Sequence, residues 1–249
     1  MRAAPWHDRR VPALRPVTVA LPAQTGRQDG LAYGLWLPEA QPRGGVVILH
    51  GAGSCKENHH DYARVVLAAG FAAVTFDQRG HGESEGPMDG RAIDDVAQMA
   101  TLLRAATGDP GLAVALRGSS MGGYFAIVAA PACGARAVVA ICPAPAEGLV
   151  RGLRAQRFSF AADVSALEEL LTTHDLFAAV RSLKVPLLVL HAEGDEQVPV
   201  EHSRELIAAA HVRASRLVAL PGGHHRSVQH DDALQAVSLR FVERALRAG

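Results

Sequence analysis

A serine in a short glycine-rich turn, Ser120, is the residue of this chain with the clearest chemical use. It follows an apolar run, residues 112–116, and stands at the centre of residues 118–122, Gly-Ser-Ser-Met-Gly, ahead of an apolar segment rich in small residues. A buried strand, a sharp glycine-flanked turn and a helix are the setting of a nucleophile elbow. The turn strains its central residue, so the neighbouring positions must lack bulky side chains. The pattern predicts that the Ser120 hydroxyl is held out at the top of a sheet.

The same pattern, Gly-x-Ser-x-Gly, occurs again at residues 82–86, around Ser84. This second copy follows a loop instead of a strand, and it leads into Pro87 without a helix directly behind the serine. Because an elbow needs both flanking elements, we interpret the second copy as a structural loop.

A serine hydroxyl needs a base to take its proton, and the base needs a third group to orient it. In enzymes built on such an elbow, the order along the chain is Ser, then Asp or Glu, then His. Asp195 is the candidate acid, because its loop follows the apolar run 185–190 and would lie at the same sheet edge as Ser120. Glu193 and Glu196 are competing carboxylates nearby.

The base is expected in the loop after the last strand, where residues 222–226 read Gly-Gly-His-His-Arg. Two adjacent histidines leave the choice open: counted from the first glycine, G-x-x-H selects His225 and G-x-H selects His224. We favour His225. Metal binding by His224, His225 and His230 is a weaker alternative, because no carboxylate or cysteine stands at a strong ligand spacing.

Backbone amides that stabilise negative charge on an attacked carbonyl oxygen are expected at two places. One is the residue after the nucleophile, Met121. The other is the loop after the apolar run 46–49, where residues 50–54 read His-Gly-Ala-Gly-Ser. Its small residues let a substrate oxygen approach the backbone, and Ala52 is our candidate. This loop lacks the glycine and lysine spacing of phosphate-binding loops, so a nucleotide site is disfavoured.

The composition excludes several classes of protein. The chain has 249 residues, of which 49% are hydrophobic, with 25 basic and 25 acidic side chains. A neutral chain of this size suits one domain with a large core, and it disfavours nucleic acid or an anionic membrane as the main partner. Three cysteines without metal-binding spacing suggest reduced thiols. With no signal-like or membrane-spanning apolar run in view, we expect a cytoplasmic protein.

The elements that carry the candidate residues follow from the hydrophobic pattern. Strands at 17–21 and 31–37, separated by a polar turn around 26–30, suggest an antiparallel pair at a sheet edge. After residue 45, strands and helices alternate. The strands are expected at 46–49, 71–76, 112–116, 137–141, 185–190 and 216–220, and the main helices at about 58–69, 91–106, 200–210 and 231–246. About eight strands, mostly parallel, with helices on both faces predict an α/β fold in a single domain over residues 1–249.

Residues 143–173 break this alternation with two prolines and a mixed apolar and basic stretch. One interpretation is a short cap-like insertion over the carboxyl edge of the sheet, where ligands bind in open α/β sheets. The other is an ordinary crossover helix with a long lead-in. Both interpretations stay open.

Together these motifs resemble the α/β-hydrolase superfamily over nearly the whole chain, above all its small serine esterases and its aminopeptidase-like and dienelactone-hydrolase-like members. The matching segments are residues 50–53, 76–84, 118–123, 194–195 with 198–199, and 222–225. The resemblance implies Ser120, Asp195 and His225 as a catalytic triad. It also implies that the Arg-Gly-His-Gly loop is structural, with four residues that brace the active-site edge: Asp77, Arg79, His81 and Ser84. The short middle segment departs from relatives with a full helical cap.

These residues predict a serine hydrolase that cleaves a small ester through an acyl-enzyme. Ser120 would attack the carbonyl carbon, His225 would carry the proton and Asp195 would orient the imidazole. No metal or organic cofactor is needed. Peptidase, thioesterase and acyltransferase activities use the same triad and stay as alternatives, as does a non-catalytic binding protein of this fold. The expected partner is a small acyl molecule, not nucleic acid or a membrane; the oligomeric state is left open, a homo-oligomer included.

Overall fold

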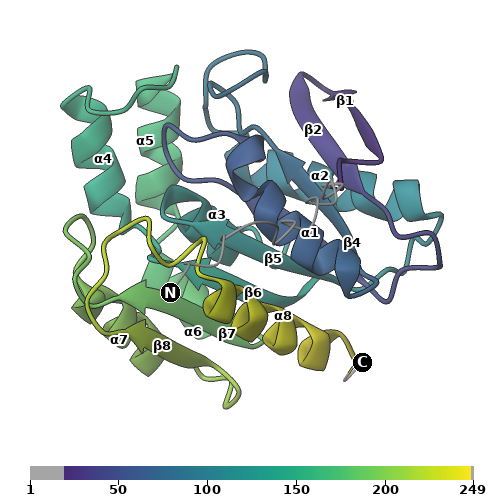
Figure 1. The fold of residues 1–249 in the computed structure, drawn as a ribbon. Coiled ribbons are helices and arrows are strands. Elements are labelled where there is room, and N and C mark those ends of the chain that lie inside the picture. Colours follow the sequence, from purple (N-terminus) through teal and green to yellow (C-terminus); the bar gives the residue numbers. More distant parts are fainter. Residues whose placement is uncertain (1–19, 248–249) are drawn as a thin grey trace, which may run out of the picture.

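A single twisted sheet carries all the loops that hold candidate residues (Figure 1). The computed structural model describes residues 20–247, and within them the sheet has 8 strands in the order β1-β2-β4-β3-β5-β6-β7-β8. Their bounds are β1 Gln24–Gln28, β2 Leu31–Trp36, β3 Gly45–Leu49, β4 Ala72–Phe76, β5 Val114–Ser119, β6 Ala135–Ile141, β7 Leu187–Ala192 and β8 Arg216–Leu220.

The six strands from β4 to β8 in this order run parallel to one another. At the other edge, β2 pairs antiparallel with both β4 and β1. Parallel strands covered on both faces read as continuous apolar runs, which is why the sequence pattern identified them. In a parallel sheet the carboxyl ends meet at one edge. The ends of β3, β5, β7 and β8 therefore bring together the loops that follow Leu49, Ser119, Ala192 and Leu220.

Helices cover both faces of the sheet and enclose two apolar cores. On one face lie α1 (His60–Ala68), which follows a short 3-10 turn, Lys56–His59, and α8 (Asp232–Arg247). The other face is covered by α2 (Ala92–Thr107), α3 (Met121–Val128), α6 (Leu176–Ser182) and α7 (Val200–Ala209). No helix in the described part of the chain is long and apolar enough to cross a membrane.

The amino-terminal edge of the sheet differs from the prediction. The strand expected at 17–21 falls largely outside the described residues, and Ala20 and Leu21 are not in a strand. The first observed strand is β1, in part of the stretch expected to be a polar turn; the turn itself is confined to Asp29 and Gly30, both with positive φ. The prediction was wrong because β1 is a polar, largely exposed edge strand, so burial imposes no apolar pattern on it. The antiparallel pairing of the first two strands at the edge is confirmed.

Two further helices, α4 (Ala146–Arg154) and α5 (Val164–Thr173), lie between β6 and α6. They pack against each other at one end of the molecule (Figure 1). The loop between them is fastened to the loop after β4, because Ala161 N donates to Gly80 O at 3.1 Å and Met88 N donates to Ala161 O at 2.9 Å. The segment expected to be irregular is therefore a helical pair held at one corner.

Candidate active site

The turn between β5 and α3 has the geometry of an elbow. Ser120 has φ 54° and ψ −115°, a strained conformation for a residue with a side chain. Two glycines make it possible: a Cβ at Gly118 would lie 1.9 Å from Gly122 O, and one at Gly122 would lie 2.4 Å from His50 O. Both obstacles are backbone atoms, which cannot move aside. The half-buried Ser120 thus stands where the apolar strand and helix meet, as the sequence predicted.

Asp195 lies in the loop after β7, with its carboxylate fully buried. Its Oδ1 accepts hydrogen bonds from the amides of Gln197, at 2.8 Å, and Val198, at 2.9 Å. Burial raises the pKa of this carboxyl group, but hydrogen bonds from His191, His225 and the two amides outweigh burial and hold the pKa of Asp195 well below its usual range. Asp195 is therefore a permanent anion at the sheet edge.

The adjacent histidines have different surroundings. His225 is buried, and its Nδ1 lies 2.7 Å from Asp195 Oδ2. Because an ionised carboxylate only accepts hydrogen bonds, Nδ1 carries the proton and Nε2 is left to take one from a substrate or nucleophile. His224 is exposed, and its Nδ1 accepts from the Arg226 amide at 3.3 Å. The structure thus brings His225, and not His224, onto the acid.

The competing carboxylates do not contact the His225 ring in the described residues. Glu193 forms an ion pair with Arg204 at 3.1 Å, and Glu196 accepts from the His225 backbone amide at 3.2 Å. Both side chains are exposed to solvent.

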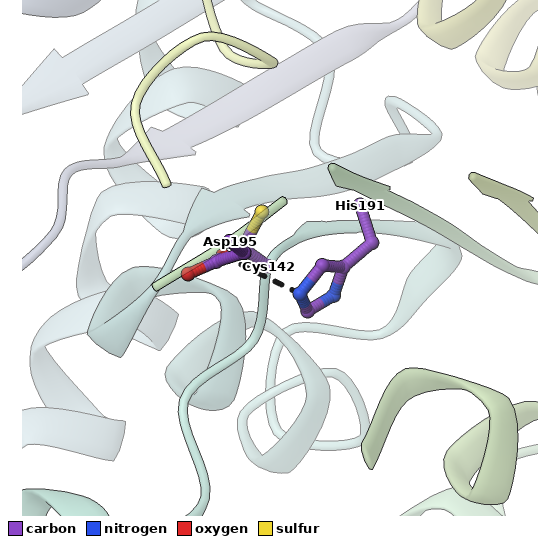
Figure 2. Close-up of side chains that lie close together, drawn as sticks. All are labelled: Cys142, His191 and Asp195. Carbon is purple, nitrogen blue, oxygen red and sulfur yellow. Dashed lines mark ion pairs between the residues drawn. The ribbon is translucent and has the colours of Figure 1, made fainter. Parts of the chain in front are cut away.

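The three histidines weighed as metal ligands are not gathered together. His230 is hydrogen-bonded instead to Asp61, with Nδ1 2.7 Å from Oδ2. Among residues 20–247, the one group of three with ligand atoms within 4.8 Å of one another is Cys142, His191 and Asp195 (Figure 2). Protein atoms already occupy both ring nitrogens of His191. Burial raises the pKa of the Cys142 thiol and keeps it neutral, so this set suits hydrogen bonding better than metal coordination.

The loop after β3 lies against the elbow. A Cβ at Gly51 would be 3.3 Å from Ser120 Cβ, so the two backbones are in close contact. The Gly53 amide is already used, because it donates to His81 Nε2 at 3.1 Å. Within the described part of the chain, the amides of Ala52 and Met121 have no protein acceptor. Both therefore remain available to an oxyanion.

Comparisons with known proteins identify relatives of the chain. A family model described as serine aminopeptidase, S33, matches residues 40–162. The monoacylglycerol lipase of Mycolicibacterium smegmatis is 29% identical over 239 residues, which cover 78% of this chain and 85% of that protein. The crystal structure of Paleococcus ferrophilus monoacylglycerol lipase superimposes with a TM-score of 0.65 at 21% identity, covering 88% of this chain and 99% of that one. A soluble variant of Saccharomyces cerevisiae monoglyceride lipase gives 0.73 at 15% identity, covering 95% and 97%. The chain is a serine hydrolase of the α/β-hydrolase superfamily.

In this hydrolase, the loop after β4 is hydrogen-bonded to the segment that follows β3 and stabilises it. The buried Asp77 accepts from the backbone amide of Lys56 at 2.7 Å and from its ammonium group at 2.9 Å. Ser84, in the second Gly-x-Ser-x-Gly copy, accepts from Ala32 N at 2.8 Å and donates to Asp77 O. Both hydrogen-bonding directions of its hydroxyl are therefore used within the protein.

A narrow apolar gap lies beside the elbow of the hydrolase, and in this structure it is too tightly packed to hold a water molecule. It begins at Met121, directly after Ser120, and runs between α3 and the α4–α5 pair. Its lining is entirely apolar: Met121, Phe125, Leu149, Leu153, Phe158, Phe160, Leu167 and Leu171. The Phe160 ring also stacks on His81, with 4.1 Å between ring centroids, so the lining continues onto the residue that holds the Gly53 amide.

Three residues of this site were not singled out from the sequence. Gln229 joins the loop of His225 to the elbow strand: its carbonyl accepts from Arg117 Nη2 at 3.1 Å, and its side chain accepts from Ser119 Oγ at 2.9 Å. Arg117 is fully buried, with its guanidinium 3.8 Å from the centre of the Tyr62 ring. The remaining one, His191, contacts Asp195. Arg117 interrupts the apolar sequence of β5, and this was the one sequence signal that could have predicted its buried contact with Gln229.

Proposed function

We propose that Ser120, His225 and Asp195 act as a catalytic triad with which this hydrolase cleaves carboxylic esters of apolar acyl groups. One observation carries the proposal: Nδ1 of the buried His225 lies 2.7 Å from Oδ2 of Asp195, whose carboxylate is buried. The two residues follow the elbow serine in the expected chain order and lie at the same edge of the sheet. The relatives named monoacylglycerol lipases support an ester as the substrate.

The reaction has two stages. Ser120 Oγ attacks the carbonyl carbon while His225 Nε2 takes its proton, and the amides of Ala52 and Met121 stabilise the oxyanion. The tetrahedral intermediate collapses when His225 returns the proton to the leaving alcohol. Water then attacks the acyl-enzyme, again with His225 as base, and releases the acid. Throughout, Asp195 keeps the proton on Nδ1 and stabilises the imidazolium.

The apolar gap supports an acyl chain as the group next to the carbonyl. Aminopeptidase activity, which the matching family model suggests, requires a site for a protonated amine, and none of the residues that line the gap is acidic. The gap also holds no water-sized space as it stands, so an acyl chain enters only if the lining side chains separate. We therefore assign to α4 and α5 the role of a short cap that selects short acyl chains.

The test is hydrolysis of p-nitrophenyl esters from acetate to octanoate, combined with labelling by a fluorophosphonate and mass spectrometry of the labelled peptide. We expect label on Ser120, loss of hydrolysis in Ser120→Ala and His225→Ala, and activity within about threefold of wild type in His224→Ala. Label on Ser84, or an active Ser120→Ala variant, would overturn the mechanism.

The pocket assignment is tested separately. Phe158→Ala enlarges the gap and should move the preferred ester toward longer chains, whereas Phe177→Ala, a partly buried phenylalanine of α6 outside the lining, should leave the preference unchanged. An unaltered chain-length profile in Phe158→Ala would place the acyl group elsewhere.

The compartment and assembly of the hydrolase belong to the proposal too. The free thiols of Cys55, Cys133 and Cys142 suit a reducing, cytoplasmic environment. The substrate is a small molecule, and activity requires no nucleic acid or membrane. Size-exclusion chromatography with light scattering would measure the oligomeric state.

A further inference from the structure

A second histidine contacts the carboxylate of the proposed triad (Figure 2). His191 is part of β7 and is fully buried. Its Nε2 lies 3.3 Å from Asp195 Oδ2 and 2.9 Å from Val198 O, while its Nδ1 lies 2.7 Å from Ser203 Oγ in α7. Asp195 Oδ2 is thus shared by two imidazole rings, one from strand β7 and the other from the loop after β8.

The partners of His191 determine where its proton lies. The Val198 carbonyl and the Asp195 carboxylate only accept hydrogen bonds, so Nε2 must carry a hydrogen. Nδ1 of the neutral ring then accepts from the Ser203 hydroxyl. The Val198 carbonyl and the Asp195 carboxylate therefore select this tautomer, and the Ser203 hydroxyl supports it by donating to Nδ1.

We propose that His191 is a positioning residue of the triad: its Nε2–H holds Asp195 Oδ2 in place and shares that oxygen with His225, which sets how strongly the carboxylate supports the base. The proposal rests on the proposed function. It assigns a task to a residue that lies outside the triad and does not touch the substrate.

The contacts of Asp195 favour this role over simple packing. The backbone amides hold Oδ1, but they leave Oδ2 to the two histidines. Three N–H donors are hydrogen-bonded to the buried anion, and the Nε2–H of His191, whose nearer acceptor is Val198 O, is a fourth at 3.3 Å; each stabilises the charged form. The titratable groups that face this pair from the neighbouring elements are Cys142 after β6, Glu196 and His225 in the adjoining loops, and His202 in α7.

Loss of the donor should change both rate and pH dependence. In His191→Leu, Asp195 Oδ2 loses the ring that holds it in place, and because misplacement of a catalytic group costs about one to two factors of ten in rate, kcat should fall about 10- to 100-fold with KM unchanged. Asp195 then stabilises the His225 imidazolium more strongly. Since His225 must be neutral to act as base, the acid limb of kcat/KM should move to higher pH, by about 0.5 units or more.

The matched variant is His191→Gln, whose amide N–H reaches the position of Nε2 and should restore most of kcat and the position of the acid limb. Ser203→Ala keeps the ring but removes the hydroxyl that holds its Nδ1, so the ring is less firmly placed and the limb should shift in the same direction by a smaller amount. Thermal unfolding of every variant separates loss of folded protein from loss of rate, and exposed His224→Ala is the control.

A shifted limb in His191→Leu and Ser203→Ala, with rescue in His191→Gln, supports the proposal. Should His191→Leu not fold, Ser203→Ala decides alone. Activity that falls only in step with stability, while the acid limb stays in place, would overturn the proposal and leave His191 as a packing residue. An active Ser120→Ala variant would instead refute the triad itself, so the two failures are distinguishable.

Discussion

The Gly-x-Ser-x-Gly turn at residues 118–122 joins a buried strand to a buried helix, whereas the same pattern at residues 82–86 lies in the loop between β4 and α2. The first turn strains its serine and leaves the amide of the next residue without a protein acceptor. The second uses its serine hydroxyl twice, as acceptor from Ala32 and donor to Asp77.

The glycines of the two turns differ in the same way. Gly122 lies against the backbone carbonyl of His50, whereas a Cβ at Gly86 would meet nothing within 4 Å. A Cβ at Gly82 would meet the Asp77 side chain, 2.2 Å away. One turn is thus built for close backbone packing under a strained serine, the other for hydrogen bonding around a buried carboxylate. The pattern of five residues does not distinguish them; the elements on either side do.

The serines themselves should separate the two turns most clearly. Ser120→Ala should lower kcat/KM by about 10⁴- to 10⁶-fold, because removal of a triad nucleophile leaves only oxyanion stabilisation and binding. Its melting temperature should stay at or above that of wild type. Ester hydrolysis and thermal unfolding measure both quantities, and Ser84→Ala is the control that should keep the activity of its remaining folded fraction. Equal losses of activity in the two variants would contradict the distinction.

The glycine comparison predicts the next largest effect. Gly122→Ala places a methyl group against two backbone carbonyls and should lower the free energy of unfolding by about 3–5 kcal/mol. Gly86→Ala has open space but a φ of 71°, so it should cost only about 1 kcal/mol. Urea unfolding of the two variants tests this, and similar losses would show that backbone contact does not decide the difference.

His50 connects both turns, since its carbonyl meets Gly122 and its Nε2 accepts from Gln78 N at 3.0 Å. Burial first, and then the nearby His81, lower the pKa of His50 to about 4, against weaker opposing effects of Gly51 O, Asp77 and Glu57. The unfolded chain therefore binds more protons between pH 4 and 6.5, and stability should fall as the pH drops through this window.

The size of that loss is about 3 kcal/mol at most, from ~1.4 kcal/mol per pKa unit. Urea unfolding at pH 7 and pH 4.5 measures it, with the exposed His224→Gln as the matched variant. His50→Gln should show a smaller pH dependence than either protein. An equally steep dependence in His50→Gln would assign the acid sensitivity to other groups.

The smallest expected effect concerns the second serine. Ser84→Ala removes the acceptor of Ala32 N and a donor to Asp77 O, and it should lower the free energy of unfolding by about 1–2 kcal/mol. Ser84→Thr keeps the hydroxyl and serves as the control in the same urea titration. No change in Ser84→Ala would mean that the loop is held by Asp77 alone.

Much of the fold could be predicted because burial leaves a pattern. The strands from β3 to β7 are covered on both faces, so each appears as an apolar run, and the half-exposed β8 is still apolar enough that its prediction matches the observed strand from Arg216 to Leu220. The candidate residues followed from the same logic, since loops after parallel strands share one edge. The structure then placed His225 on Asp195, a choice that two adjacent histidines had left open.

What escaped prediction depends on contacts between distant segments. β1 is polar and is defined by its pairing with β2, not by its own pattern. Gln229 resembles any loop residue, and its link to Arg117 joins positions 112 apart. His191 closes an apolar strand, and only the fold shows that it faces Asp195. Similarly, residues 143–173 were predicted only as a cap-like insertion or a crossover helix, and neither the α4–α5 pair nor the corner that fastens its loop was foreseen.

The proposed acid and base of this hydrolase share one border of the sheet. Their loops follow β7 and the half-exposed outermost strand β8, and they are tied to each other by Glu193 N to Leu220 O and Gly194 N to Gly222 O, both at 2.9 Å. The nucleophile belongs to the central strand β5. The edge strands of a sheet unfold locally more readily than its central strands. Gentle heating should therefore unfold the loops of Asp195 and His225 together while the turn around Ser120 stays folded. Inactivation would then precede melting and reverse on cooling, with amide exchange fastest along β8.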